Sequence, residues 1–242
     1  MNKYLRRIAV SAIFVATQLN VNAQSGTYYT IRDFQTWSSV GLDIEMSKKV
    51  EFGFQQQLRL KDNSSALKQY FTEGYFKYNI LKNWSFATEY RILRNNDTEG
   101  NIQGIEKRQR LAFNTIYSLE VKRAKLLFRT QYQRRTERED GVGLVGDPVE
   151  KIRLRAGMKY NIKNWKLDPR ISCELFQPLE GSGNLEKYRV TLGTKYSLKK
   201  VGDFRLFYRF ERDINIAFPR STHIVGFNYS YTIKRKKKKE VR

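Results

Sequence analysis

The sequence predicts an all-β protein that folds as a closed antiparallel transmembrane β-barrel of about 12 strands, with roughly 10 to 12 allowed by the pattern. Three observations predict this fold. Side chains alternate between apolar and polar along most of the chain, short and long connections alternate, and the N-terminus resembles an export signal. The 242 residues include 15 Tyr and 15 Phe, too many aromatics for a disordered chain. No run of apolar residues is long enough for a transmembrane helix.

The first 23 residues have the composition of a cleavable signal peptide. Three cations precede a mainly apolar segment at 8–16 that is too short to cross a bilayer, and Val21 and Ala23 fit the small-residue cleavage rule. We therefore expect cleavage after Ala23. Removing the three cations lowers the formal net charge from +22 to +19 (22 − 3); they are Lys3, Arg6 and Arg7. An exported protein does not meet intracellular nucleic acid, so we predict no nucleic-acid partner.

From Phe34 onward, apolar residues recur at every second position, which is the period of a β-strand with one apolar face. Along residues 50–60, for example, Val50, Phe52 and Phe54 alternate with polar or small residues. The alternation continues, in chain order, with apolar faces that include Trp84/Phe86/Tyr90/Ile92, Leu111/Phe113/Tyr117, Leu126/Phe128/Tyr132, Ile152/Leu154/Met158/Tyr160, Tyr188/Val190/Leu192/Tyr196, Phe204/Leu206/Tyr208/Phe210 and Val225/Phe227/Tyr229/Tyr231.

Connections of two lengths separate these strands. Short turns are expected near 47–49, 81–83, 120–124, 161–164 and 198–202, and longer polar links near 61–67, 95–105, 137–149, 177–185 and 213–221. Outer-membrane barrels alternate in this way between tight periplasmic turns and longer external loops. Eleven strands are clear. Because bacterial barrels usually have an even number, we expect residues 26–33 to add a twelfth; alternatively, this segment threads the lumen and the barrel closes otherwise.

A short internal repeat places aromatic residues beside two of the predicted periplasmic turns. Residues 78–84 read Tyr-Asn-Ile-Leu-Lys-Asn-Trp, and residues 160–165 read Tyr-Asn-Ile-Lys-Asn-Trp. Such aromatics are typical of the belt where a barrel meets the lipid headgroups. The predicted interface aromatics are Tyr78, Trp84, Tyr117, Tyr160, Trp165 and Tyr196.

The same alternation would also fit a secreted soluble β-barrel or sandwich that turns its apolar face inward, around an apolar ligand in the case of a barrel. A barrel of about eleven strands is wider than its own side chains would normally fill, which favours the membrane protein.

The polar face, which we expect to line the barrel interior, is rich in charges. By strand parity it carries arginines and glutamates: Arg59, Arg91, Arg108, Arg110, Arg129, Arg153, Arg155, Arg170, Arg189, Arg205 and Arg209, with Glu51, Glu73, Glu89, Glu174 and Glu211. One hypothesis is a narrow channel for small, anionic solutes, since rings of cations lower the barrier for anions. The other is a network of arginine–carboxylate pairs that closes the barrel, with a structural role in the membrane.

The sequence offers little for catalysis. His223 is the only histidine and Cys173 the only cysteine, and we predict no catalytic residue, no metal site and no cofactor. Parity places both on the apolar face, where Cys173 is expected to fill space. Barrel closure would bring His223 near Thr36 or Ser38, so a lipid-modifying enzyme with a serine nucleophile is an alternative hypothesis.

The expected domain layout is a signal peptide at 1–23, the barrel at 24–233 and a basic periplasmic tail at 234–242. The tail can contact anionic headgroups. The charged segment 134–140 is expected to lie outside, where it can meet lipopolysaccharide phosphates, and the glycine-rich segment 141–146 to be a flexible external loop.

The chain resembles the outer-membrane β-barrel family catalogued as domain of unknown function 2490. The resemblance rests on Trp37 with the alternating Leu42 and Ile44, the Lys48-Lys49 turn, and the strand that ends at Arg59, and it spans about residues 33–233. It implies a location in the outer membrane of a Gram-negative cell and no catalytic residues. A protein there would have outer-membrane lipids, lipopolysaccharide and the barrel-assembly machinery as partners.

Overall fold

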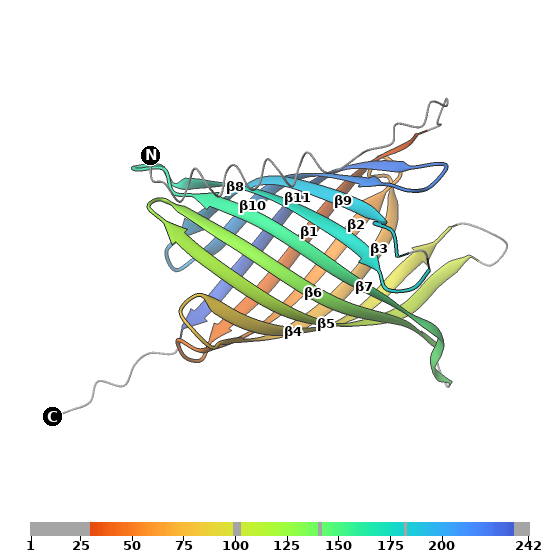
Figure 1. Ribbon diagram of the computed structural model, residues 1–242, viewed down its shortest axis with the longest axis horizontal. Helices are drawn as coiled ribbons and strands as arrows, with labels where there is room; N and C mark the ends of the chain where they lie inside the picture. Colours follow the sequence, from red (N-terminus) through yellow and green to blue (C-terminus); the bar gives the residue numbers. More distant parts are fainter. Residues whose placement is uncertain (1–29, 99–102, 140–141, 182, 235–242) are drawn as a thin grey trace.

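A computed structural model of the protein describes residues 30–98, 103–139, 142–181 and 183–234. These residues form β-strands and no helix (Figure 1), so the all-β prediction is confirmed. The strands are β1 (Ile31–Glu45), β2 (Val50–Lys61), β3 (Ala66–Asn79), β4 (Trp84–Asp97), β5 (Gly104–Val121), β6 (Ala124–Glu139), β7 (Gly143–Tyr160), β8 (Leu167–Pro178), β9 (Lys187–Leu198), β10 (Gly202–Asp213) and β11 (Arg220–Lys234). The predicted signal peptide and its cleavage site lie outside the described residues, as does the tail beyond Lys234.

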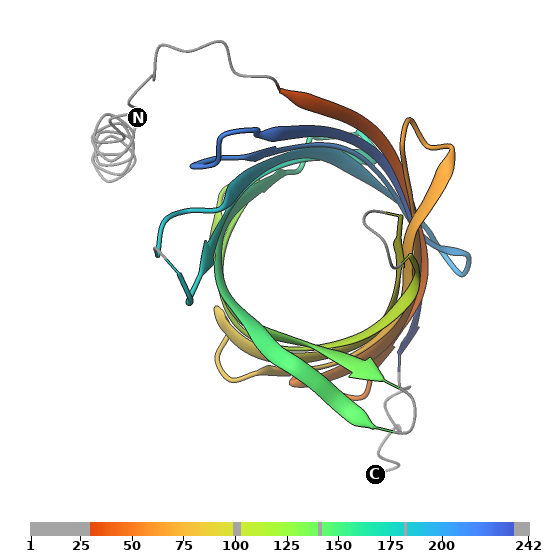
Figure 2. The ribbon, with the colours of Figure 1, turned by 90° about the vertical axis from the view of Figure 1, so that its right-hand side faces the viewer.

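The strands close into one barrel, seen end-on in Figure 2. Consecutive strands pair antiparallel, but β1 and β11 pair parallel, in register from Ile31–Arg220 to Glu45–Lys234. The fold is therefore a mixed barrel, close to the twelve-stranded antiparallel barrel that was predicted but not identical to it. The physical reason is parity. In a meander with an odd number of strands, the first and last strands run in the same direction, so the seam that closes the described barrel is parallel.

Residues 26–33 do not form a separate strand within the described part of the chain. Ile31–Asp33 is the beginning of β1, and residues 26–29 lie outside the described residues. The described barrel consequently has eleven strands and closes without the predicted twelfth.

The connections define two ends of the barrel. The short-turn end carries 46–49, 80–83, 122–123, 161–166 and 199–201, together with the last residues of β11. The long-loop end carries 62–65, 98–103, 140–142, 179–186 and 214–219, together with the start of β1. Several of the second set are shorter than predicted because the strands continue beyond the region of clear alternation.

The largest such difference is between β6 and β7. Most of the predicted link at 137–149 is paired strand, with Glu137 opposite Val145 and Arg138 opposite Leu144 after a register shift. Gly143 and Gly146 therefore belong to β7 rather than to a flexible loop. Glu137, Arg138 and Glu139 place polar side chains on both faces of β6 here, so the hydropathy pattern does not predict that the strand continues.

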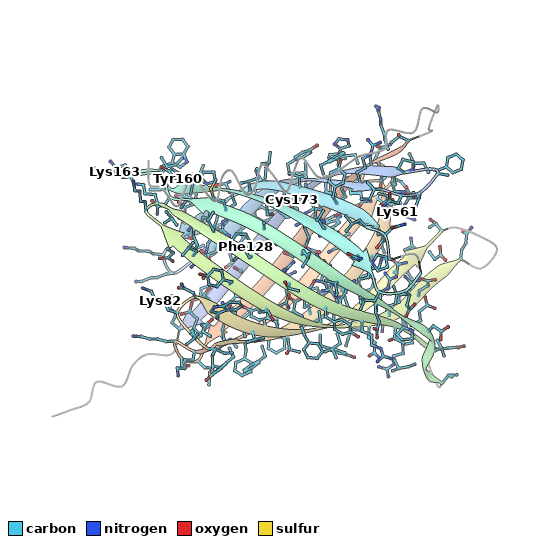
Figure 3. All side chains as sticks on the ribbon, in the orientation of Figure 1. Lys61, Lys82, Phe128, Tyr160, Lys163 and Cys173 are labelled. Carbon is cyan, nitrogen blue, oxygen red and sulfur yellow. The ribbon has the colours of Figure 1, made fainter. Side chains whose placement is uncertain are left out.

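The barrel wall has an apolar outer face and a polar inner face. Large apolar side chains such as Phe54, Leu206 and Val40 are more than half exposed. Phe128, which is 48% exposed, can be followed on the outer face in Figure 3. Polar side chains such as Gln131, Asn114 and Glu174 are almost fully buried. This distribution is the reverse of that in a soluble barrel with an apolar interior. No helix long and apolar enough to cross a membrane occurs among the described residues.

Candidate functional site

Glu174 on β8 is the centre of a buried charge cluster in the barrel interior. One carboxylate oxygen, Oε1, lies 2.6 Å from Nη2 of Arg129 and 2.9 Å from Nη2 of Arg153, and Oε2 lies 3.0 Å from Nη1 of Arg189. Arg189 also reaches Glu211 on β10, with its Nη2 2.7 Å from Oε1 of that carboxylate. This single carboxylate thus offsets part of the positive charge of three guanidinium groups, which come from β6, β7 and β9.

A second cluster surrounds Glu73 on β3. Arg91 on β4 donates to its Oε2 from Nε at 2.7 Å, with Nη2 at 2.5 Å, and Arg110 on β5 donates from Nη2 at 3.0 Å. Arg110 also lies 3.3 Å from Oε2 of Glu89. The same oxygen of Glu89 accepts a 3.1 Å hydrogen bond from Gln131 on β6, so the two clusters meet where Gln131 stands opposite Arg153.

Several of these contacts join strands that are not neighbours in the sheet. Arg129 (β6) reaches Glu174 (β8) past β7, and Gln131 (β6) reaches Glu89 (β4) past β5. Side chains can meet across an intervening strand only on the concave side of a closed sheet. The charged face therefore points inward, where strand parity places it.

Aromatic rings on the inner face of the barrel lie against several of the guanidinium groups. The guanidinium carbon of Arg59 lies 3.6 Å from the centre of the Trp37 ring, and that of Arg91 lies 3.6 Å from the Phe71 ring. Arg153 and Arg189 both lie 4.6 Å from the Phe176 ring. The list of lining residues predicted from sequence lacked these three aromatic residues, because apolar side chains on the inner face break the alternation; their parity with the arginines is the signal that could have found them.

The charged side chains of these clusters are closely packed in the interior. Glu174, Glu73, Arg91, Arg110, Arg153 and Gln131 are each at most 9% exposed. In a wide water-filled lumen such side chains would be solvated on their free side. Their burial shows that neighbouring interior side chains cover them at this level.

Five interior arginines have no carboxylate within ion-pair distance among the described residues: Arg59, Arg155, Arg170, Arg205 and Arg209. Arg59 donates to Gln57 at 2.7 Å, Arg209 to Thr191 at 3.1 Å and Arg155 to Ser172 at 3.0 Å. They come from β2, β7, β8 and β10, and their positive charge faces the interior without direct contact to a carboxylate of the described residues.

The two remaining predicted lining residues lie towards the barrel ends. Arg108, near the long-loop end, pairs with Glu106 at 2.7 Å and with Glu137 at 2.8 Å. Glu51, near the short-turn end, accepts hydrogen bonds from Tyr75 at 2.7 Å and from Lys77 at 3.0 Å.

All six predicted interface aromatics lie at the short-turn end. Tyr78, Trp84, Tyr160 and Trp165 are 38–58% exposed on the outer surface. Tyr117 packs on Trp84 with ring centres 4.9 Å apart, and Tyr196 stands opposite Leu167 at the start of β8. At the long-loop end, rings of Tyr188, Phe210 and His223 form a second outer cluster, with Phe210 6.1 Å from Tyr188 and 5.2 Å from His223.

His223 and Cys173 both lie on the outer face. Nδ1 of His223 is 2.6 Å from the hydroxyl of Tyr208, and Phe34 stands opposite His223 on β1. The hydroxyl of Thr36 is instead 2.7 Å from that of Ser64. Cys173 is exposed. Within the described ranges, no three or more His, Cys, Asp or Glu side chains group as a metal site would require.

Comparison with known proteins places the chain in a family. A search of curated proteins by sequence finds no match. The family described as "Protein of unknown function (DUF2490)" matches residues 34–221, from the first strand to the beginning of the last. That match covers most of the barrel, including every charged residue of the interior clusters. The chain therefore belongs to the DUF2490 family, as its resemblance to that family predicted.

Proposed function

We propose that this protein is an outer-membrane β-barrel that provides a narrow pathway for small anions. The outer surface supports the membrane location, since a continuous band of exposed apolar side chains is unstable in water and stable against lipid. The aromatic clusters near both ends of the barrel suit two headgroup regions.

The observation that carries the anion preference is the set of five interior arginines that form no ion pair with a carboxylate in the described part of the chain. A carboxylate within ion-pair distance offsets part of the field of a paired arginine. An unpaired arginine in a narrow, low-dielectric passage attracts anions and repels cations. The passage therefore has a positive lining although it contains several glutamates.

A second candidate is a closed barrel with a structural role in the membrane. The observation that favours it is the burial of Glu73 and Glu174 with their arginines at mid-depth. Side chains held in such a network leave little free width. The two candidates differ in one measurable property, the passage of ions.

Conductance across a planar bilayer tests the proposal. The full chain is reconstituted, and the reversal potential is recorded under a potassium chloride gradient. We expect small conductance steps and a reversal potential whose sign shows that chloride permeates more readily than potassium. Complete absence of conductance would favour the closed barrel, and a cation preference would contradict the proposed pathway.

A matched pair of double variants assigns the preference to the interior. Arg170→Gln with Arg205→Gln removes two unpaired interior charges, and we expect the chloride preference to fall. Arg94→Gln with Arg212→Gln removes two charges whose strand positions face outward, and we expect no change. An equal effect of both pairs would mean that the overall charge of the barrel, and not its lining, sets the preference.

A further inference from the structure

The connections at the two ends of the barrel carry opposite charges. The five turns at the short-turn end contain nine basic residues and no acid: Lys48, Lys49, Lys82, Lys122, Arg123, Lys163, Lys166, Lys199 and Lys200. The five connections at the long-loop end contain five acids and no basic residue: Asp62, Glu99, Asp140, Glu180 and Glu186. The connections are therefore cationic at the short-turn end and acidic at the long-loop end.

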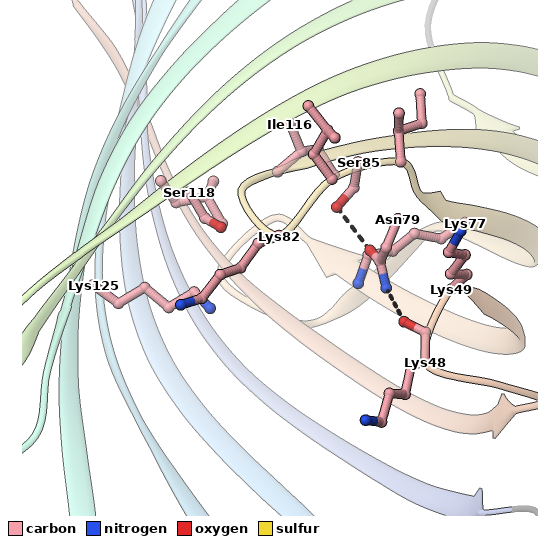
Figure 4. A pocket seen from close by; sticks show the side chains of 12 residues that line it. Lys48, Lys49, Lys77, Asn79, Lys82, Ser85, Ile116, Ser118 and Lys125 are labelled. Atoms are coloured by element: carbon pink, nitrogen blue, oxygen red, sulfur yellow. Dashed lines mark hydrogen bonds between the residues drawn. The ribbon is translucent and has the colours of Figure 1, made fainter.

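A cavity of about 530 Å³ lies inside the mouth at this cationic end (Figure 4). It is bounded by the first two short turns and by strands β3 to β6. Five lysines line it and no carboxylate does: Lys48, Lys49, Lys77, Lys82 and Lys125. We call it the lysine pocket. Ser85 and Ser118 add hydroxyl groups, and Ile80 and Leu81 add apolar surface.

The backbone around the lysine pocket is held in place by hydrogen bonds. Nδ2 of Asn79 donates to the carbonyl of Lys48 at 3.0 Å, and its Oδ1 accepts from the hydroxyl of Ser85 at 2.8 Å (Figure 4). The backbone N–H of Asn79 donates to the carbonyl of Lys49 at 2.7 Å. The lysines of the first turn thus project from a site tied to β3 and β4, and not from a free loop.

Three of the five lysines form no ion pair with a described residue. Lys77 pairs with Glu51 at 3.0 Å and Lys125 with Glu120 at 3.1 Å. For Lys48, Lys49 and Lys82, no carboxylate of the described residues lies within ion-pair distance. These three exposed ammonium groups border one cavity that no carboxylate lines, so the cavity favours an anion over a cation.

We propose that the lysine pocket binds a phosphate group. Lysine binds phosphate as a point charge with rotatable donors, and the serine hydroxyls can donate to the remaining phosphate oxygens. The phosphate can belong to a lipid headgroup, which the exposed Ile80 and Leu81 beside Lys82 would suit, or to a soluble phosphorylated compound. This inference does not depend on conduction, because a closed barrel would present the same pocket.

Binding to the full chain in a phosphate-free maltoside detergent tests the inference. The probes are inorganic phosphate, glycerol 3-phosphate and short-chain phosphatidylglycerol, with titration calorimetry for the soluble probes and native mass spectrometry for the lipid. The test variant combines K48Q, K49Q and K82Q. The matched control combines K163Q, K199Q and K200Q, which removes the same charge from the same end of the barrel but outside the pocket.

We expect at least one probe to bind, with affinity about tenfold or more weaker for the pocket variant and within about twofold of wild type for the control. Binding of glycerol 3-phosphate would identify a soluble compound as the ligand class, and binding of phosphatidylglycerol alone would identify a lipid headgroup. No binding of any probe, or equal weakening of binding by both variants, would overturn the proposal that the lysine pocket binds phosphate.

A heat-dependent shift in gel mobility reports whether each variant forms the barrel. If the triple variant does not fold, the single variant Lys82→Glu replaces it, with Lys200→Glu as its control. Loss of phosphate binding with unchanged conductance would separate this site from the proposed anion pathway.

Discussion

Arg129 and Glu174 form an ion pair at 2.6 Å although strand β7 lies between their strands. The contact is possible because the closed sheet is curved and both side chains project from its concave, inner face. Glu174 also pairs with Arg153 and Arg189. Three interior ion pairs therefore depend on the charge of this one carboxylate.

Replacement of Glu174 should therefore strongly destabilise the barrel. Glu174→Gln leaves three arginines around a neutral side chain, and removal of one partner from a buried pair costs about 3–5 kcal/mol. We expect that loss in the free energy of unfolding, measured by urea titration with tryptophan fluorescence. Glu120→Gln, which removes an exposed partner of Lys125, should leave the transition unchanged. Similar stability of the two variants would mean that the interior ion pairs are solvated.

A glycine beneath an aromatic ring should tolerate no side chain. A Cβ atom built on Gly53 would lie 2.1 Å from Cε1 of Tyr75. Gly53→Ala should push away this ring, whose hydroxyl lies 2.7 Å from a carboxylate oxygen of Asp43 and of Glu51, and lower stability by about 1–3 kcal/mol. Gly74→Ala is the control, since its nearest contact would be an ordinary 3.6 Å from Phe54. The same unfolding titration compares them, and equal curves would contradict the packing of Tyr75.

The three tryptophans should report separately on the two faces of the wall. Trp84 and Trp165 are exposed on the outside at the short-turn end, whereas Trp37 is 2% exposed inside. In liposomes with brominated acyl chains, variants that keep only Trp84 or only Trp165 should be quenched, and the variant that keeps only Trp37 should not. Quenching of Trp37 alone would invert the faces, and no quenching at all would count against the membrane location.

Cys173 should be protected by lipid. It is exposed on the outer face of β8, near the middle of the strand. In liposomes we expect a charged, membrane-impermeant maleimide to react with it slowly, and rapidly after unfolding in detergent and urea. Asn63→Cys in a Cys173→Ala background places the thiol in the turn 62–65 at the long-loop end, where folded protein should react at once. Equal rates at both positions would show that the wall of β8 faces water.

The inward placement of the charges was predictable because strand parity is local. The side chains of a strand point alternately to opposite faces, so Arg91, Arg110 and Glu89 had to share a face once the strands were recognised. Trp37, Phe71 and Phe176 were missed as interior residues because hydropathy alone reads an apolar side chain as belonging to the apolar face.

Some of the predicted loop lengths were wrong for a related reason. Between β6 and β7 the chain remains paired where Glu137, Arg138 and Glu139 follow one another without the apolar alternation that marks a strand. Backbone hydrogen bonds maintain that pairing, and they leave no trace in hydropathy.

The sequence by itself determined the all-β class, the two faces of each strand, the family and the residues available to line the interior, since all of these follow from residue types and a period of two. Only the tertiary structure decided that β1 closes on β11 in parallel, that Glu174 contacts three arginines, and that Lys48, Lys49 and Lys82 line one cavity. It also decided that Arg170 and Arg205 form no ion pair with any residue that the structure describes. These relationships depend on register and curvature, which bring together side chains from strands far apart in the chain and which no local pattern encodes.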